Sequence, residues 1–294
     1  MTDQTAHVSI IGLPASGKTT FLAALWHMVR EPGASTTLGF ENLSQGNYEH
    51  LNALAKRWRS GKIQQRTQHS GAKTVSMRLK DEGNRLVEVS FPDMPGEDFG
   101  RMWELREADH GMLETLSTPA IVLLVNGDTI KHPLWIVEQS KLASAMAKAA
   151  GNGLPTTPDP EPIDWSPDFA PTQVRIVDLL QMLMSGELNV GTRRLAVLIS
   201  AWDKVAAEEL SPEELLEAKL PLLAQYLRNG RDPWTWRVWG VSAQGGVYED
   251  PDKAESLPET DALRELERPS DRIQIVDGDQ LSTDITLPLQ WLIC

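Results

Sequence analysis

The sequence predicts an α/β protein built on a mostly parallel, twisted sheet with helices on both faces. Short apolar runs of strand length alternate with longer stretches of helical periodicity. A glycine-rich loop joins the first run, residues 8–11, to the first helical stretch. The runs at 120–125 and 195–199 are apolar throughout, which is typical of strands buried on both faces of a parallel sheet.

The amino-terminal part of the chain predicts a strand, two helices and a hairpin. After the strand at 8–11, residues 19–30 and 47–59 each carry apolar side chains at helical spacing. Residues 73–80 alternate apolar and polar side chains, and a short polar turn leads from them into the apolar positions of 86–91. This pattern is typical of two antiparallel strands joined by a tight turn.

The remaining elements continue the alternation of strands and helices. Residues 245–270 look irregular and acidic, and Trp234, Trp236 and Trp239 alternate with other residues in a run that we expect to pack in the core or an interface. We expect strands at 120–125, 195–199, 238–241 and 272–276, and helices at 132–150, 173–184, 212–227 and 284–294.

We expect the 294 residues to form a single domain, residues 1–294, with three additions. Residues 31–72 form a long connection between the first helix and the hairpin. Residues 151–172 hold six prolines and little periodicity, which predicts an exposed insert. Residues 245–294 form a carboxyl-terminal extension.

The composition limits the classes of function. A net charge of −13 argues against general nucleic-acid binding and against docking on anionic lipid, because both need a basic surface. The single cysteine, Cys294, cannot form an intramolecular disulfide. The chain has no 18-residue apolar run and its start lacks a signal-peptide core, so we expect a cytoplasmic protein that does not enter membranes.

The glycine-rich loop Gly12-Leu-Pro-Ala-Ser-Gly-Lys-Thr19 matches the phosphate-binding P-loop pattern. Such a loop turns successive backbone N–H groups toward one anion, and the following helix adds its positive end. We expect Lys18 to reach the β- and γ-phosphates and the Thr19 hydroxyl to bind Mg²⁺. The residues expected at the phosphates are Gly12, Pro14, Ala15, Ser16, Gly17, Lys18, Thr19 and Thr20.

A second motif, Asp93-Met-Pro-Gly96, follows the predicted hairpin. An aspartate at the end of a strand downstream of a P-loop is placed to hold Mg²⁺ through a water molecule. The backbone N–H of Gly96 would then be available to the γ-phosphate.

Together with two later motifs, these residues resemble the TRAFAC class of Ras-like P-loop GTPases. The whole chain also resembles the bacterial double-GTPase domains associated with conflict or defence systems. That closer resemblance is carried by Gly-Leu-Pro-Ala-Ser-Gly-Lys-Thr-Thr-Phe-Leu-Ala-Ala-Leu and by Asp284-Ile-Thr-Leu-Pro-Leu-Gln-Trp-Leu292. The resemblance implies a Ras-like fold, GTP as the nucleotide and a partner protein.

In that class an Asn/Thr-Lys-x-Asp motif reads the base, and here Ser200-Ala-Trp-Asp203 stands in its place. Asp203 is retained and could accept hydrogen bonds from guanine, whereas the asparagine and the stacking lysine are absent. Trp202 or Lys204 could cover the base instead. Ser242-Ala243 occupies the place of the loop whose backbone contacts the base O6.

The class also places a threonine on Mg²⁺, in the first nucleotide-sensing loop (switch I). Thr67 is our choice within the expanded region 31–72, with Thr36 and Thr37 as rivals. For hydrolysis, Glu97 takes the place of the usual glutamine that orients water. We therefore expect slow turnover, with Arg66, Arg101 or a partner supplying positive charge.

These motifs favour a GTP-dependent switch that acts with a protein partner, with Lys18, Thr67, Gly96 and Glu97 as the catalytic group. Two alternatives stay open. A P-loop kinase or ATPase acting on a small molecule would need a lid with arginine, and residues 151–172 contain neither arginine nor lysine. The other is a scaffold that binds GTP without hydrolysing it.

Overall fold

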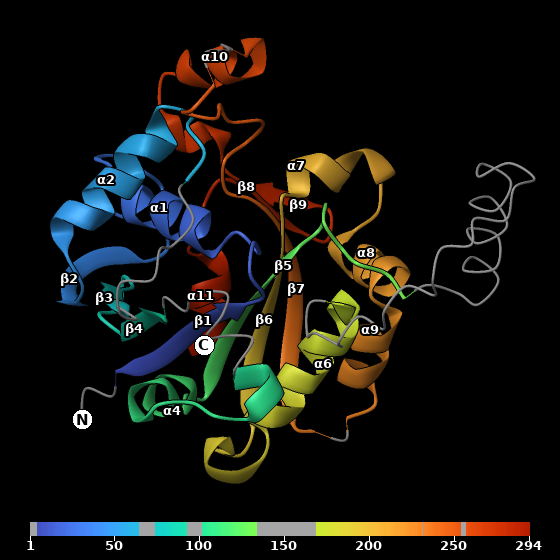
Figure 1. The fold of residues 1–294 in the computed structure, drawn as a ribbon. Helices are drawn as coiled ribbons and strands as arrows, with labels where there is room; N and C mark the ends of the chain where they lie inside the picture. The colour runs from blue at the N-terminus through green and yellow to red at the C-terminus, as the bar shows by residue number, and fades with distance from the viewer. Residues whose placement is uncertain (1–4, 65–73, 93–101, 134–168, 231, 254–256) are drawn as a thin grey trace, which may run out of the picture.

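The computed structural model describes residues 5–64, 74–92, 102–133, 169–230, 232–253 and 257–294. The described strands form one nine-stranded sheet in the order β2-β3-β4-β1-β5-β6-β7-β8-β9 (Figure 1). The strands are β1 (Ala6–Gly12), β2 (Gly39–Gln45), β3 (Val75–Lys80), β4 (Leu86–Phe91), β5 (Ala120–Asn126), β6 (Arg193–Ser200), β7 (Trp234–Ser242), β8 (Gln274–Asp277) and β9 (Gln280–Ser282).

The central strands β4, β1, β5, β6 and β7 run parallel. Antiparallel strands extend the sheet at both edges, β3 and β2 beside β4, and β8 and β9 beside β7. All five carboxyl ends of the parallel strands therefore lie at one edge of the sheet, where α/β proteins bind their ligands. The predicted α/β class with a mostly parallel sheet is confirmed.

Helices cover both faces of this sheet. The helices whose bounds lie within the described residues are α1 (Lys18–Met28), α2 (Tyr48–Arg59), α4 (His110–Leu116), α6 (Thr172–Leu183), α7 (Trp202–Val205), α8 (Pro212–Lys219), α9 (Pro221–Arg228), α10 (Pro258–Arg264) and α11 (Leu287–Ile293), with 3-10 turns at Gly186–Leu188, Ala206–Glu208 and Pro269–Arg272. The buried faces of α1, α2 and α11 join one hydrophobic core, and those of α4, α6, α8 and α9 join the other.

Alternate residues of each central strand enter the two cores. In β5, Val122 and Leu124 belong to the core under α1, α2 and α11, whereas Ile121 and Leu123 belong to the opposite one. This division follows from the two-residue period of a strand and explains why the central strands are apolar throughout. The tryptophans of β7 pack as expected, with Trp234 and Trp239 buried and Trp236 partly buried against the core.

The structure corrects the expected helix at 212–227, which is two helices, α8 and α9. Proline at 221 has no N–H for a helical hydrogen bond, and its ring disfavours helical geometry at the residue before it. Leu220 accordingly has φ −132° and ψ 52°. The capping box that begins α8 is present, with the Ser211 side chain accepting from the Glu214 N–H.

Other differences lie at the edges of the sheet and in the carboxyl-terminal extension. The strands β2 and β9 were not expected, because both are mostly exposed and their sequences are mostly polar. The stretch 245–270, expected to be irregular, contains α10. The expected strand 272–276 is β8, and the closing helix begins at Leu287 rather than at residue 284. Most of the expected helix 132–150 and of the insert 151–172 lies outside the described residues.

Candidate functional site

The polar residues singled out in the sequence meet at the carboxyl edge of the sheet. The loop 12–19 begins at the end of β1, and Ser200–Asp203 begins at the end of β6. Ser242 is the last residue of β7, and Ala243 follows it. The register pairs Gly12 with Leu124 and Ser200 with Val241, so these strand ends are level with one another. The sheet therefore assembles phosphate-binding and base-binding candidates at one place.

The conformation of the loop 12–19 explains its glycines. A Cβ on Gly12 would lie 2.5 Å from the Leu124 carbonyl oxygen, so only glycine fits there. Gly17 has φ +89°, in the left-handed region that favours glycine, and Ala15 adopts φ +61°. The loop then enters α1 directly, with Gly17 as its N-cap.

The side chains of Lys18 and Ser16 have different surroundings within the loop. Lys18 Nζ donates to the carbonyl oxygens of Gly12 at 2.8 Å and Leu13 at 3.1 Å, which holds the ammonium over the loop. Ser16 is 3% exposed and its buried Oγ has no hydrogen-bond partner among the described residues. A buried hydroxyl of this kind costs free energy unless a ligand or water completes it.

Two residues that the sequence analysis missed hold the loop from below. Ser200 Oγ donates to the Ser16 carbonyl at 2.8 Å, and Asn126 Nδ2 donates to the Ala15 carbonyl at 3.1 Å. They end β6 and β5, the two strands that follow β1 in the sheet. The sequence could have indicated them, because each is the polar last residue of a strand that is otherwise mostly apolar. Ser200 thus ties residues 200–203 to the loop 12–19.

Asp203 is joined to the loop after β7. Ser242 Oγ donates to Asp203 Oδ1 at 2.6 Å and accepts from the Gly245 N–H at 3.0 Å. Among the described residues, Ser242 alone is seen to donate to this carboxylate, which leaves Oδ2 available to a ligand. Burial, with a smaller contribution from the Asp203 charge, raises the pKa of Tyr248 to about 12, so this phenol stays neutral.

Trp202 does not cover a base, contrary to one of the two expectations. It is 4% exposed, and a Cβ on Gly240 of β7 would lie 2.3 Å from its ring. The indole therefore packs on the sheet. Lys204 is exposed and remains as the candidate for covering the base.

Thr36 and Thr37 lie at the wrong edge of the sheet to bind a metal at the phosphate loop. Both line a cavity with Asp81, Glu82 and Gly83, at the turn that leads into β4. Because β4 runs parallel to β1, that turn is at the amino edge and the phosphate loop at the carboxyl edge. Thr37 is bound instead by the carboxyl-terminal extension, its N–H donating to Asp284 Oδ2 at 2.7 Å.

The remaining predicted residues lie outside the described residues. They are Arg66, Thr67, Asp93, Gly96, Glu97 and Arg101. Within the described ranges, no three His, Cys, Asp or Glu side chains are grouped as they would be to hold a metal.

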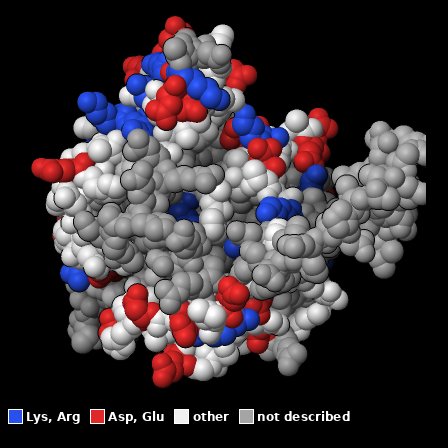
Figure 2. All heavy atoms as spheres, viewed as in Figure 1, with Lys and Arg blue, Asp and Glu red and all other residues white. Residues whose placement is uncertain are grey.

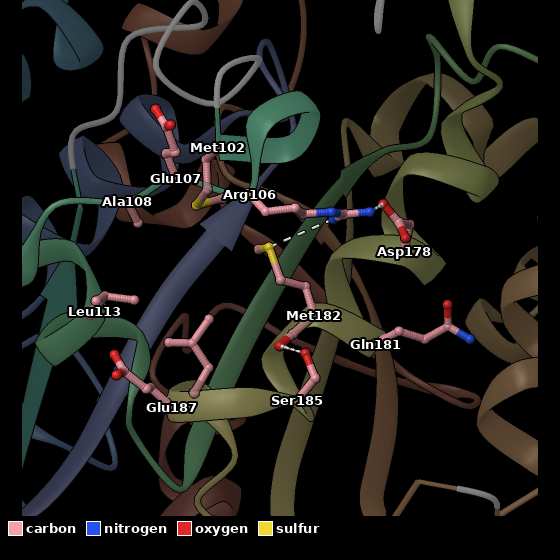
Figure 3. Close-up of a pocket in the computed structure, with 11 residues that line it drawn as sticks. Met102, Arg106, Glu107, Ala108, Leu113, Asp178, Gln181, Met182, Ser185 and Glu187 are labelled. Atoms are coloured by element: carbon pink, nitrogen blue, oxygen red, sulfur yellow. Dashed lines mark hydrogen bonds and ion pairs between the residues drawn. The ribbon is translucent and has the colours of Figure 1, made fainter.

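A cavity of about 700 Å³ lies beside the segment that follows residue 101 (Figure 3). Met102, Arg106 and Leu113 line one side, and Asp178 and Met182 of α6 line the other. Arg106 reaches across to α6, with its Nη2 2.6 Å from Asp178 Oδ2 (Figure 3). Arg106 has φ +58° and its N–H donates to the Met102 carbonyl. None of the phosphate- or base-binding candidates lines this cavity.

The face of the molecule shown in Figure 2 mixes charges of both signs. In Figure 2 lysine and arginine side chains lie among aspartate and glutamate, most densely near α2 and α10. The basic last turn of α2 (Lys56, Arg57 and Arg59) contributes to that region. Across the described part of the chain, no helix has both the length and the apolar character needed to span a membrane.

Solved structures similar to this chain include several GTP-binding proteins, each at a TM-score below 0.4. For the signal recognition particle receptor SRb-GTP/SRX complex from Chaetomium thermophilum, identity is 14%, coverage is 84% of this chain and 94% of that chain, and the TM-score is 0.37. For a putative nucleolar GTP-binding protein 1 from Plasmodium falciparum, identity is 13%, coverage is 84% of this chain and 82% of that chain, and the TM-score is 0.36. For the Ski7 GTPase-like domain of S. cerevisiae bound to GTP, identity is 11%, coverage is 87% of this chain and 46% of that chain, and the TM-score is 0.37.

No curated protein matches the chain. The model of one protein family, Double-GTPase 1, matches residues 9–292, which is nearly the whole chain and includes the loop, β6 and β7. This chain is a P-loop GTPase-type protein that belongs to the Double-GTPase 1 family.

Proposed function

We propose that the chain is a GTP-binding molecular switch that hydrolyses GTP slowly. The observation that carries the proposal is the hydrogen bond between Ser242 Oγ and Asp203 Oδ1, 2.6 Å long. It joins α7, which follows β6, to the end of β7, the neighbouring parallel strand, at the same edge of the sheet as the phosphate loop. A base held by Asp203 and phosphates held by the loop are the two halves of one nucleotide.

The phosphates would lie on the loop 12–19. We expect Lys18 Nζ to leave the Gly12 and Leu13 carbonyls for the β- and γ-phosphates, which offer it full negative charges. The full set of phosphate-binding residues is Gly12, Pro14, Ala15, Ser16, Gly17, Lys18, Thr19 and Thr20.

Thr19, in the first turn of α1, is placed to bind Mg²⁺ through its hydroxyl. Asp93 would bind the ion through water, and Thr67 would complete the site. Mg²⁺ bound there would supply positive charge between the β- and γ-phosphates. The half-buried Thr19 next to Lys18 fits this role.

Guanine would be read by Asp203 and the loop after β7. The carboxylate can accept from N1–H and the exocyclic amine of guanine, a pair of donors that adenine does not offer in that arrangement. The backbone at Ser242-Ala243 would contact O6, and Lys204 would lie over the base. Specificity then follows from complementary donors and acceptors.

For hydrolysis, Glu97 would orient the attacking water and the Gly96 N–H would bind the γ-phosphate. Arg66, Arg101 or a partner protein would offset the charge that develops during phosphoryl transfer. Loss of the γ-phosphate would release the loops around Thr67 and Asp93–Arg101. We place this switch in the cytoplasm, where it acts on a protein effector in a bacterial defence or regulatory system.

The test is competition of GTP, ATP and xanthosine triphosphate for the wild-type protein and Asp203→Asn. We expect the wild type to prefer GTP. Asp203→Asn leaves guanine N–H groups unpaired, which costs about 1–3 kcal/mol and weakens GTP about 5- to 150-fold. It should favour xanthosine triphosphate, because an amide can donate to the carbonyl that xanthine carries in place of the amine.

Asp128→Asn is the matched control. Asp128 is an exposed carboxylate just after β5, at the same edge of the sheet. It should leave all three affinities unchanged. Equal wild-type affinity for GTP and ATP, unchanged in Asp203→Asn, would remove the base-reading role. Phosphate release measured with GTP and with ATP then separates a GTPase from an ATPase and from a non-hydrolysing scaffold.

A further inference from the structure

The base-reading loop is supported by a tryptophan that is 185 residues away in the sequence. Trp58, near the end of α2, is 0% exposed. Its indole Nε1 donates to the carbonyl oxygen of Ala243 at 2.7 Å. Ala243 directly follows Ser242, whose hydroxyl holds Asp203. One buried side chain from the long connection between α1 and β3 is therefore hydrogen-bonded to the loop after β7.

Trp58 is itself held from two sides. The His27 ring of α1 lies 5.1 Å from the Trp58 ring, centroid to centroid. The Arg272 guanidinium lies 4.8 Å from the same ring, and Arg272 also donates to the Trp58 carbonyl at 3.2 Å. Arg272 further donates to the Tyr248 hydroxyl at 3.2 Å. The indole is thus fixed by the helix of the phosphate loop and by the carboxyl-terminal extension.

The backbone segments that follow Trp58 and Ala243 also pair with each other. The Ile63 N–H donates to the Glu249 carbonyl at 2.9 Å, and the Glu249 N–H donates to the Gly61 carbonyl at 2.8 Å. Arg264 of α10 donates to the Ser60 carbonyl at 3.0 Å and forms an ion pair with Glu249. Figure 1 shows the resulting arrangement, with α10 beside the end of α2 at the top of the molecule.

From these contacts we infer that Trp58 is a positioning residue for recognition of the purine base. This inference rests on the proposed GTP site. Guanine carries an acceptor at O6 where adenine carries an amino group, so a backbone N–H in the Ser242-Ala243 loop favours guanine only while the loop stays in place. Such sites need their groups held within about 0.5 Å. The bond from Trp58 to Ala243 supplies that restraint.

The experiment measures the dissociation constants of GTP and ATP for the wild type, Trp58→Phe and Trp26→Phe. Trp58→Phe keeps an aromatic ring in the core and removes the indole N–H. Leaving the Ala243 carbonyl without its donor should weaken GTP about tenfold and ATP less than about twofold. The dissociation constant of ATP divided by that of GTP should therefore fall about fivefold or more.

Trp26→Phe is the control. Trp26 is also buried, at 1% exposed, and its indole also donates one hydrogen bond, to Asn52 Oδ1 at 3.0 Å. That acceptor belongs to α2 rather than to the base loop. Both variants should lower the melting temperature, but only Trp58→Phe should change the ratio of GTP to ATP affinity.

Two failures are distinguishable. A wild type that does not prefer GTP contradicts the proposed base-reading site, whatever Trp58 does. A wild type that prefers GTP, with the same preference in Trp58→Phe, overturns the inference and leaves Trp58 as a packing residue. If Trp58→Phe does not fold, Arg272→Lys removes the guanidinium that lies over the Trp58 ring and donates to the Trp58 carbonyl, and an unchanged preference there overturns the inference as well.

Discussion

At the scale of single residues, two glycines create the room in which the site is built. Gly12 lets the loop pass under the Leu124 carbonyl, and Gly240 lets the Trp202 ring lie flat on β7. Trp202 directly precedes Asp203, so the packing of the indole ring on β7 also affects the position of the Asp203 carboxylate. Neither glycine is explained by a turn of the backbone. Each is explained by a group from elsewhere in the chain that lies where a Cβ would be, the Leu124 carbonyl at Gly12 and the Trp202 ring at Gly240.

Gly240→Ala should therefore damage both stability and recognition. The added Cβ would lie 2.3 Å from the Trp202 ring, which has to move and carry Asp203 with it. Overpacking of this kind costs about 1–3 kcal/mol. We expect a lower free energy of unfolding in urea and weaker GTP binding, with ATP binding affected less.

Gly39→Ala in β2 is the control for this change. Its added Cβ would meet only the Lys80 carbonyl, at 3.9 Å. Unfolding and GTP affinity should stay close to those of the wild type. If Gly240→Ala binds GTP as tightly as Gly39→Ala does, the packing of Trp202 does not position Asp203.

At the scale of elements, the start of α11 fastens the segment between α1 and β2. The Asp284 carboxylate, 6% exposed, accepts from the Thr37 N–H at 2.7 Å and from the Thr286 N–H at 2.8 Å. Thr286 Oγ1 in turn lies 2.9 Å from Thr37 Oγ1 and accepts from the Leu38 N–H at 3.2 Å. These bonds explain why β2, a strand with little apolar patterning, is held at the edge of the sheet.

Asp284→Ala should lower the free energy of unfolding by about 1–3 kcal/mol, because it leaves the buried N–H of Thr286 and the partly buried N–H of Thr37 without this acceptor. The GTP dissociation constant should change little, since this cluster lies at the amino edge of the sheet. Asp279→Ala, an exposed aspartate in the turn between β8 and β9, should change neither quantity. Urea titration and nucleotide binding check both; a large loss of GTP affinity in Asp284→Ala would mean that this cluster supports the nucleotide site.

At the scale of the whole molecule, the nucleotide is expected to act as part of the fold. It would contact the ends of several parallel strands and the start of α1, and any ligand that binds only the folded state stabilises it by mass action. At a concentration 100 times the dissociation constant, this stabilisation is about 2.7 kcal/mol.

We therefore expect GTP with Mg²⁺ to raise the melting temperature of the wild type by about 5 °C or more. Lys18→Ala should lose this rise at the same GTP concentration while melting near the wild type without nucleotide, since Lys18 adds little to the core. Lys80→Ala, which removes a surface lysine paired with Glu41, should keep the full rise. An undiminished rise in Lys18→Ala, followed by differential scanning fluorimetry, would contradict the phosphate-loop assignment.

The sequence by itself determined the central part of this protein. The strand β1, the loop 12–19 and α1 follow from apolar periodicity and from glycines whose role is set within a few residues of chain. The parallel arrangement of β5 and β6 follows from runs that are apolar on both faces. The prediction of Asp203 as a site residue rested on the resemblance of Ser200-Ala-Trp-Asp203 to the base-reading motif of the class. It stays a prediction, to which the structure adds the hydrogen bond with Ser242.

Tertiary structure alone decided the rest. Strands β2 and β9 are polar edge strands that form because a neighbouring strand offers hydrogen bonds, which no pattern in their own sequences reports. Trp202 is buried because Gly240 leaves space for its ring, and Thr37 is placed by Asp284. Trp58 reaches Ala243 across 185 residues of sequence. Local periodicity records which face of an element is apolar, whereas these contacts depend on which distant groups the folded sheet brings within hydrogen-bonding distance.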